Sequence, residues 1–232
     1  MDIQAIVFDK DGTLADFPST FNPATGKVIE FLSKGDKKLA NRIAQVWDYD
    51  LEAKEIRDTS VIVAGSGYDI TIALGSVLDI GDPIEYSRFL DRLYGEISQT
   101  TVAAISGVGS ALKQLRTQGF RLGIATNDAQ HNALSQMEVL GFDSYFDIVL
   151  GADSGHGAKP GPGMIEAFIA HIGLQPSQIL MVGDSLHDLE AGKAANVMTC
   201  GVETGPAPRA ELETKADIVL TSVAELPDWL AS

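Results

Sequence analysis

The sequence predicts an α/β protein in which a parallel sheet carries helices on both faces and a module of helices is inserted after the first strand. Two patterns predict this fold. Short apolar runs of strand length alternate with amphipathic helical patterns over much of the chain, whereas residues 17–104 show helical patterns alone. Alternating strands and helices are typical of a parallel sheet that is covered on both faces.

Six apolar runs have the length and composition of buried strands. They are mostly continuous, whereas strands with one solvated face alternate apolar and polar residues. We therefore expect these runs to form the sheet of a core domain. The runs are residues 3–8, 121–125, 147–150, 179–182, 198–202 and 218–220.

Helical patterns lie between the later runs. Apolar residues recur at helical spacing within residues 108–115, 134–140 and 165–172. Each pattern is followed by a glycine, which is the most common residue just past the end of a helix. We therefore expect helices to connect the later strands. The glycines are Gly119, Gly141 and Gly173.

The inserted module has helix signals of its own. Asn22 and Pro23 have the residue types of a helix start. Asp82 and Pro83 repeat this signal before an apolar stripe that continues to Ile97. We therefore expect the module to consist of helices. Two further helical stripes lie at residues 39–47 and 70–78.

The length of 232 residues suits one large domain with an inserted subdomain. We expect a core domain of residues 1–16 and 105–232, and a helical domain of residues 17–104. No apolar run approaches the ~18 residues of a membrane span, and the N-terminus lacks the cationic stretch of a secretory signal. The single cysteine, Cys200, excludes an intramolecular disulfide. These features predict a cytoplasmic protein.

The chain is strongly acidic, with a formal net charge of −15. Such a charge repels nucleic-acid backbones and anionic membranes, so we expect neither as a partner. It also repels free phosphate. A phosphate site in this chain therefore needs local positive charge from a metal ion or a lysine.

The first predicted strand ends in the string Asp9-Lys10-Asp11-Gly12-Thr13. Sheets of this type bind ligands at the carboxyl ends of their strands. Two carboxylates two residues apart can simply form a turn, but this string rarely arises by chance. Its position directly after a strand makes chance rarer still. We therefore interpret it as part of a functional site.

Polar residues also follow three later strands. Thr126 and Asn127 end the second strand of the core, and Lys159 lies in a glycine-rich segment shortly after the third. Asp184 and Asp188 follow the fourth. Since all strand ends of a parallel sheet fall on one edge, we expect these side chains to converge with those of the first string.

This group of side chains fits phosphoryl transfer. We predict Asp9 as the nucleophile, because a carboxylate can form a covalent intermediate that divides a difficult displacement into two easier steps. Asp11 is the candidate acid and base. Lys159 would supply fixed positive charge, and Thr126 with nearby backbone N–H groups would hold phosphoryl oxygens. The further substrate-binding positions are Gly12 and Asn127.

Mg²⁺ is the expected cofactor. It prefers hard oxygen ligands, which Asp9, Asp184 and a backbone carbonyl near Asp11 can supply. The ion would reduce the repulsion between nucleophile and phosphate and orient the transferred group. Asp188 lies about one helical turn after Asp184, and we expect it to orient Lys159 or a metal-bound water.

Five segments carry a resemblance to a known family and occur in the family's order. They are DKDGTL at residues 9–14, IATND at 124–128, LGFDSYFDIVLGADS at 140–154, KPGP at 159–162 and MVGDSLHD at 181–188. On these motifs the chain resembles the haloacid dehalogenase superfamily, and within it the phosphoglycolate-phosphatase-like branch with a helical cap. The resemblance covers nearly the whole chain. It implies a Rossmann-like core, Mg²⁺ dependence and hydrolysis of a small phosphate monoester, phosphoglycolate-like or a sugar phosphate, through an aspartyl-phosphate.

The same resemblance bears on substrate choice. True dehalogenases lack the second acid of the first motif, so Asp11 favours hydrolysis of a phosphate ester. The cap would select the organic part of the substrate. Residues 63–68 resemble the glycine-rich cap loop of phosphoglycolate phosphatases, which makes Gly65 and Ser66 candidate substrate-binding residues, but the segment also fits a simple turn. Phe17 departs from the branch pattern and is expected to reshape the pocket.

Two alternatives to a phosphatase use the same residue types. A phosphomutase would carry the same motifs and shield the aspartyl-phosphate from water. A non-catalytic switch resembling a response-regulator receiver also uses a strand-end aspartate, a Thr or Ser and a Lys, although receivers are uncapped. The sequence leaves open which phosphorylated metabolite is the substrate and whether the chain is a monomer or a homodimer.

Overall fold

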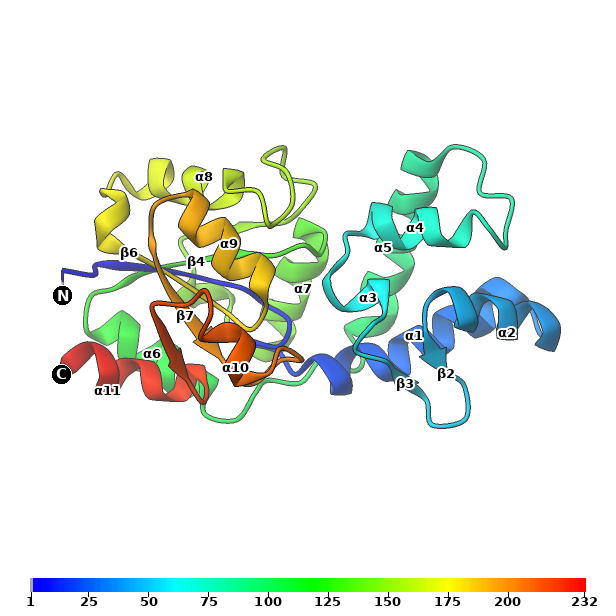
Figure 1. The fold of residues 1–232 in the computed structure, drawn as a ribbon, viewed down its shortest axis with the longest axis horizontal. Coiled ribbons are helices and arrows are strands. Elements are labelled where there is room, and N and C mark those ends of the chain that lie inside the picture. Colours follow the sequence, from blue (N-terminus) through cyan, green and yellow to red (C-terminus); the bar gives the residue numbers. More distant parts are fainter. Residues whose placement is uncertain (1) are drawn as a thin grey trace.

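The computed structural model describes residues 2–232 and contains a six-stranded sheet with helices on both sides (Figure 1). The strands follow the order β5-β4-β1-β6-β7-β8, and each neighbouring pair is parallel. The predicted α/β fold is therefore confirmed. The strands are β1 (Ala5–Phe8), β4 (Arg121–Ala125), β5 (Ile148–Leu150), β6 (Ile179–Gly183), β7 (Met198–Val202) and β8 (Ile218–Leu220).

The two faces of the sheet bury alternate residues of each strand. Ile6 and Phe8 belong to one apolar cluster, and Ala5 and Val7 belong to the other, because successive side chains of a strand point to opposite faces. Burial on both faces explains why these strands read as continuous apolar runs. Residues of α6 (Val108–Thr117), α7 (Gln130–Leu140) and α11 (Leu226–Ala231) complete the first cluster, and residues of α8 (Gly163–Ile172) and α9 (Leu186–Ala194) the second.

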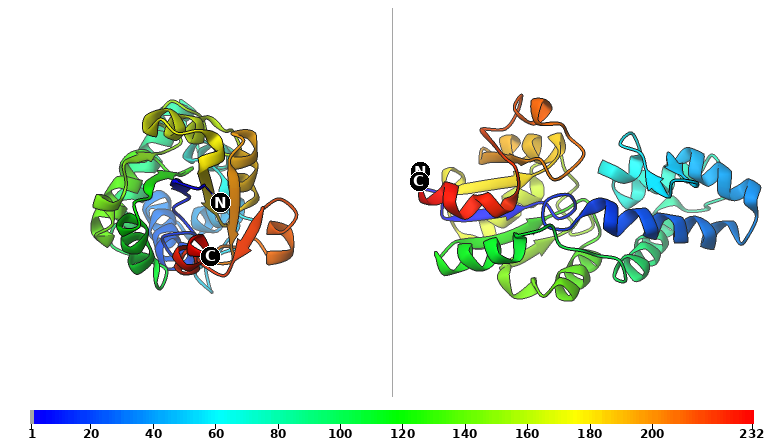
Figure 2. Two further views of the ribbon diagram at one scale, coloured as in Figure 1. Left: turned by 90° about the vertical axis from the view of Figure 1, so that its left-hand side faces the viewer. Right: turned by 90° about the horizontal axis from the view of Figure 1, so that it is seen from below.

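Helices flank the sheet on opposite sides when it is viewed along the strands (Figure 2). Four short elements complete this core: α10 (Arg209–Leu212) and the 3₁₀ turns η1 (Asp143–Tyr145), η2 (Pro176–Gln178) and η3 (Val223–Glu225). Within residues 2–232, no helix combines the length and the apolar character needed to cross a bilayer.

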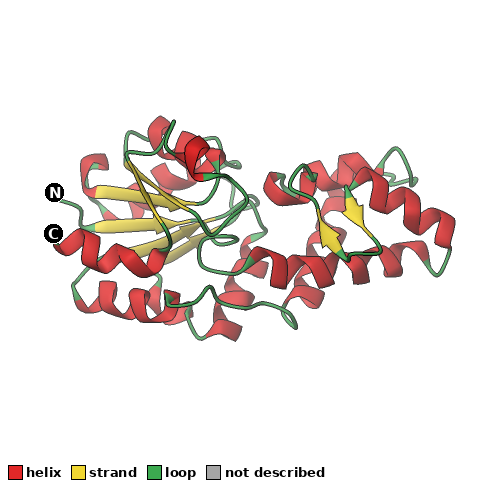
Figure 3. Ribbon diagram, turned by 60° about the horizontal axis from the view of Figure 1, so that its bottom comes forward, coloured by secondary structure: helices red, strands yellow, loops and turns green. Residues whose placement is uncertain are grey.

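The segment between β1 and α6 forms a helical part, which we define as residues 17–98. It has an apolar cluster of its own, with Trp47, Leu90 and Tyr94 among the buried members. It lies beyond the carboxyl ends of the strands, at the end of the molecule opposite α11 (Figures 1 and 3). Its elements are α1 (Phe17–Ser33), α2 (Lys37–Val46), β2 (Tyr49–Asp50), β3 (Glu55–Ile56), α3 (Val61–Ala64), α4 (Gly67–Leu74) and α5 (Pro83–Ser98).

Two details of the helical part correct the expectations from sequence. Helix α1 begins at Phe17 rather than after Asn22, because the Asp16 carboxylate caps it by accepting a hydrogen bond from the Ser19 N–H at 3.2 Å. Pro23 therefore lies inside the helix. In addition, β2 and β3 form an antiparallel hairpin in a segment that was expected to contain helices alone. The Asn22 side-chain oxygen accepts a hydrogen bond from the Ile56 N–H at 3.0 Å, which fixes this hairpin to α1.

Helix α7 of the core contacts α5 of the helical part directly. The Asn132 amide donates to the backbone carbonyl of Asp91 at 2.9 Å. One turn later, the Gln136 amide donates to the Ser98 hydroxyl at 2.9 Å. These contacts position the helical part above the carboxyl edge of the sheet.

Candidate active site

The order of the strands brings three predicted site residues together. Strand β1 lies between β4 and β6, so Asp9, Thr126 and Asp184 become neighbours, since each follows its strand directly. The Asp9 N–H donates to the Val182 carbonyl at 2.8 Å, and the Thr126 N–H donates to the Leu150 carbonyl at 3.0 Å. The hydrogen bonds between strands thus continue into the site and fix its backbone.

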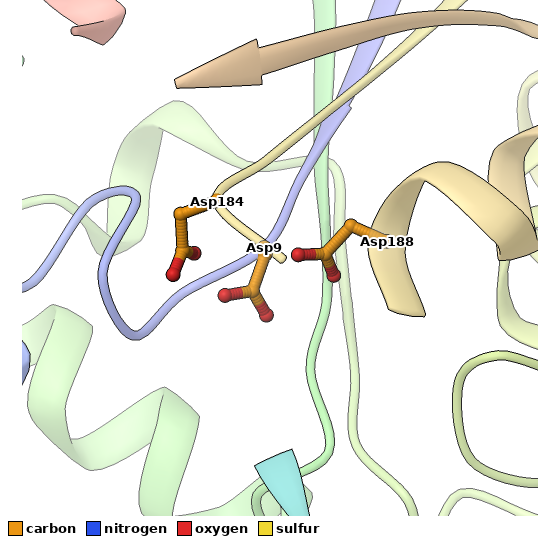
Figure 4. A group of neighbouring side chains, drawn as sticks. All are labelled: Asp9, Asp184 and Asp188. Atoms are coloured by element: carbon orange, nitrogen blue, oxygen red, sulfur yellow. The ribbon is translucent and has the colours of Figure 1, made fainter. Parts of the chain in front are cut away.

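Three buried carboxylates gather at this edge (Figure 4). One oxygen from each of Asp9, Asp184 and Asp188 lies within 4.8 Å of the others. Lys159 Nζ contacts the Asp9 and Asp188 carboxylates, each at 2.5 Å. Three ionised carboxylates and one ammonium leave two negative charges in excess. A divalent cation would balance them, and buried charges need such compensation.

The pKa values of these groups agree with an excess of negative charge. Burial raises the pKa of Asp9 to about 7; Lys159 opposes this rise, and Asp188 and Asp11 add to it. Burial also raises the pKa of Asp184, and Asp9 and Asp188 raise it further. The protein alone therefore stabilises the ionised forms poorly. Three hard oxygen donors in this setting fit Mg²⁺ or a similar hard cation.

Two segments far apart in the sequence hold the Asp184 carboxylate. The Thr13 hydroxyl donates to Asp184 Oδ1 at 2.8 Å. A Cβ on Gly12 would lie 2.3 Å from Asp184 Oδ2, and one on Gly205 would lie 1.7 Å from it. A side chain at either position would force the carboxylate or the backbone beside it to move. The Thr204 hydroxyl donates to the Gly12 carbonyl at 2.6 Å. The sequence did not predict a role for Thr204 or Gly205. The one local feature that could have indicated it is a glycine shortly after the end of β7.

Lys159 is fixed through both its backbone and its side chain. Its N–H donates to Asn127 Oδ1 at 2.8 Å, and the Asn127 amide donates to its carbonyl at 3.1 Å. The Asp188 Oδ2 atom accepts hydrogen bonds from the Ser185 N–H and hydroxyl at 3.0 and 2.7 Å, which aims Oδ1 at Lys159. Burial lowers the pKa of Lys159, but Asp188 and Asp9 outweigh burial and raise it overall. Lys159 is therefore a permanent cation beside Asp9.

Asp11 pairs with a lysine that our sequence analysis overlooked. Lys10 is fully buried, and its Nζ lies 2.6 Å from Asp11 Oδ1 and 3.2 Å from Asp128 Oδ2. It also donates to Gln136 Oε1 at 2.5 Å and lies 5.5 Å from the centroid of the Phe21 ring. Burial raises the pKa of Asp11 more than Lys10 lowers it. A raised pKa suits a carboxyl group that must hold a proton near neutral pH.

A pocket separates this edge of the sheet from the helical part. The space between them is about 860 Å³, including the part that opens to solvent. Phe17 and Gly65 line it from the helical part. On the core side, the predicted residues that line it are Asp9, Asp11, Thr126, Asn127, Lys159, Asp184 and Asp188.

Other residues that the sequence suggested for substrate binding lie elsewhere. The Ser66 hydroxyl donates to Asp69 Oδ2 at 2.7 Å and caps α4. This contact is the Ser-x-x-Asp pattern of a capping box, which the sequence itself contains. Arg57, an arginine that could in principle bind a substrate carboxylate but was expected to be simply exposed, pairs with Asp50 at 3.1 Å beside the hairpin. Among the residues that the structure describes, neither Ser66 nor Arg57 lines the pocket.

Comparisons with known proteins agree with this geometry. A model of the haloacid dehalogenase-like hydrolase family matches residues 6–202. Phosphoglycolate phosphatase of Escherichia coli K12 is 26% identical over 239 aligned residues, which cover 97% of this chain and 91% of that protein. The crystal structure of a predicted phosphoglycolate phosphatase from Haemophilus somnus 129PT aligns with a TM-score of 0.74, at 22% identity and over 99% of both chains. CbbY from Rhodobacter sphaeroides in complex with phosphate aligns with a TM-score of 0.74, at 22% identity, over 97% of this chain and 96% of that one.

Proposed function

The chain belongs to the haloacid dehalogenase-like hydrolase family and is a phosphatase of that family, and we propose that it hydrolyses a small phosphate monoester with Mg²⁺ through an aspartyl-phosphate on Asp9. One observation carries this proposal. A buried carboxylate, a permanent lysine cation and a second carboxylate that fits a metal ion meet in one pocket at the edge of the sheet. A phosphoryl group is the anion that such a mixed site can hold and transfer.

The reaction then proceeds in two steps. In the first, a carboxylate oxygen of Asp9 bonds to phosphorus, the bond to the ester oxygen breaks, and Asp11 gives its proton to that oxygen. In the second, water attacks phosphorus, Asp11 takes a proton from the water, and the bond to Asp9 breaks. Inorganic phosphate leaves and Asp9 is restored. Lys159 and Thr126 hold the phosphoryl oxygens through both steps.

We assign the metal to Asp9, Asp184 and the backbone carbonyl of Asp11. Bound there, Mg²⁺ supplies positive charge that reduces the repulsion between the nucleophile and the phosphoryl group. We assign Asp188 to Lys159, because its carboxylate contacts Nζ at 2.5 Å. The net excess of two negative charges around Asp9, Asp184 and Asp188 supports the presence of a divalent cation.

We also propose that residues 17–104 act as a cap domain over a catalytic core of residues 1–16 and 105–232. The separate apolar cluster of the helical part supports this division. So does the position of the pocket between the two. The partner is a small phosphorylated metabolite, phosphoglycolate-like or a sugar phosphate, and the cytoplasmic location expected from sequence stays a prediction.

The central experiment is a phosphatase assay with p-nitrophenyl phosphate. We expect sustained release of inorganic phosphate with Mg²⁺ and none with excess EDTA; sustained release also separates a hydrolase from a phosphomutase. Asp9→Asn is expected to abolish turnover with an unchanged circular dichroism spectrum. Asp58→Asn changes an exposed aspartate in a turn and should keep full turnover. Turnover that survives in Asp9→Asn would refute the nucleophile assignment.

Asp11→Asn tests the intermediate itself. The p-nitrophenolate group leaves without a proton, so this variant should still phosphorylate Asp9. It lacks the base that activates water, so the phosphoenzyme should accumulate. Acid quenching and mass spectrometry should then find one phosphoryl group on the peptide that contains Asp9. Turnover of p-nitrophenyl phosphate at the wild-type rate would show that Asp11 is not the base.

A further inference from the structure

The wall that the helical part contributes to the pocket is apolar and partly aromatic. The Phe17 and Phe21 rings stack with their centroids 5.0 Å apart, and Phe21 lies 6.4 Å from the Tyr94 ring. The Tyr94 hydroxyl is already hydrogen-bonded to Thr25 at 3.3 Å. The organic part of a substrate would therefore meet mainly hydrocarbon here. The apolar lining residues include Phe17, Phe21, Ile62, Ile70, Leu90 and Tyr94.

Positive charge in the pocket is confined to the edge of the sheet. Among the described residues that line the pocket, Lys159 is the one lysine or arginine and His187 of α9 the one histidine, and both belong to the core. The Lys159 Nζ forms ion pairs with Asp9 and Asp188, and in the proposed reaction it also binds the phosphoryl group. A carboxylate that faces the wall of the helical part would lose its hydration without gaining a cationic partner from that wall, which is costly in a buried site.

One acidic residue of the helical part strengthens this preference. Asp91 of α5 lines the pocket, and its Oδ1 would lie 2.0 Å from a Cβ on Gly67, so its carboxyl group rests on the backbone at the start of α4. Burial raises the pKa of Asp91 to about 7, and Asp128 and Asp153 raise it further. Above about pH 7, Asp91 is ionised and adds its charge to those of Asp128 and Asp153, so a further carboxylate beside it is disfavoured.

We propose that the substrate is the phosphate monoester of an uncharged, predominantly apolar alcohol or phenol, and that Asp91 helps to reject esters whose organic part carries a carboxylate. A hydroxyl group of the substrate can hydrogen-bond to Asp91, whereas ionised Asp91 repels a carboxylate. The inference rests on the proposed function and narrows it. It places phosphoglycolate, the substrate named for the E. coli relative, among the poor substrates of this chain.

The test compares esters that differ in charge but little in shape. Phenyl phosphate and 4-carboxyphenyl phosphate form one pair, and 2-hydroxyethyl phosphate and phosphoglycolate form the other. In each pair we expect kcat/KM to be at least about tenfold higher for the uncharged ester, because unit charges a few ångströms apart interact strongly at an effective dielectric constant of about 20. Equal or higher kcat/KM for the carboxylated esters would overturn the inference and leave the phosphatase in place. If no ester is hydrolysed, the proposed function itself fails.

The Asp91→Asn variant tests whether Asp91 causes the discrimination against carboxylated esters. At about pH 8.5, above the Asp91 pKa of about 7, removing its charge should raise the ratio of kcat/KM for 4-carboxyphenyl phosphate to that for phenyl phosphate by several-fold. Asp58→Asn removes an exposed acid outside the described lining of the pocket and should leave the ratio at the wild-type value. A ratio that does not move in Asp91→Asn would overturn the role of Asp91.

Discussion

Replacing Lys10 with methionine tests how much the buried charge network beside Asp11 stabilises the protein. Methionine keeps most of the volume of the side chain but removes the charge. The carboxylates of Asp11 and Asp128 then share a buried space without their cation, and Gln136 Oε1 loses its donor. Removing one partner of a buried ion pair costs about 3–5 kcal/mol. At ~2–4 °C per kcal/mol for a chain of this size, the melting temperature should fall by ~6–20 °C.

Thermal and urea unfolding, followed by circular dichroism, measure this effect. Lys113→Met is the matched control, because Lys113 is exposed on α6; we expect a change within about 0.5 kcal/mol. Lys10→Met/Asp128→Asn should recover part of the lost stability, since the second change removes a carboxylate that the first left without its cation. A Lys10→Met protein that melts within about 2 °C of the wild type would refute the reasoning.

Two further predictions concern the metal site and Asp91. Gly205→Ala is expected to weaken Mg²⁺ binding by at least about tenfold, because the new Cβ would lie 1.7 Å from Asp184 Oδ2 and displace this carboxylate. Isothermal titration calorimetry measures the affinity. An unchanged affinity would show that the loop moves instead of the carboxylate. Asp91→Asn should stabilise the protein more at about pH 8 than at about pH 5. The folded-state pKa of about 7 lies above the ordinary 3.8, so the folded protein keeps a proton that the unfolded chain has released, and the wild type loses stability as the pH rises from about 4 to about 7. Urea midpoints that gain equally at both pH values would contradict this origin of the effect.

The sheet could be predicted closely from the sequence because its inner strands are buried on both faces, as β1 and β6 show. The predicted run at residues 179–182 and β6 (Ile179–Gly183) differ by a single residue. Helix starts were harder to locate, because the same local signal occurs twice near the first helix. Asp16 with Pro18 and Asn22 with Pro23 have similar residue types, and only the structure shows that the first pair starts α1.

Some residues of the candidate site could be predicted from local sequence patterns, whereas others depend on contacts between distant parts of the chain. Asp9 and Asp184 directly follow strands, so a topological rule predicts that they meet. The contacts that hold Asp184 join positions far apart in the chain, such as Thr204 and Gly12, and no local pattern encodes them. Ser66 shows the opposite error, since its capping box was visible in the sequence but the glycines beside it suggested a binding loop.

The position of β1 in the middle of the sheet has a consequence for synthesis on the ribosome. Its neighbours β4 and β6 begin at residues 121 and 179, and β6 is translated roughly 10–30 s after β1 at typical elongation rates. The helical part ends at residue 98 and carries its own apolar cluster, so it can fold while the first strand still lacks both partners. The helical part can therefore form before β1 is paired, and the edge of the sheet where Asp9 and Asp184 meet can be completed only after β6 has been synthesised.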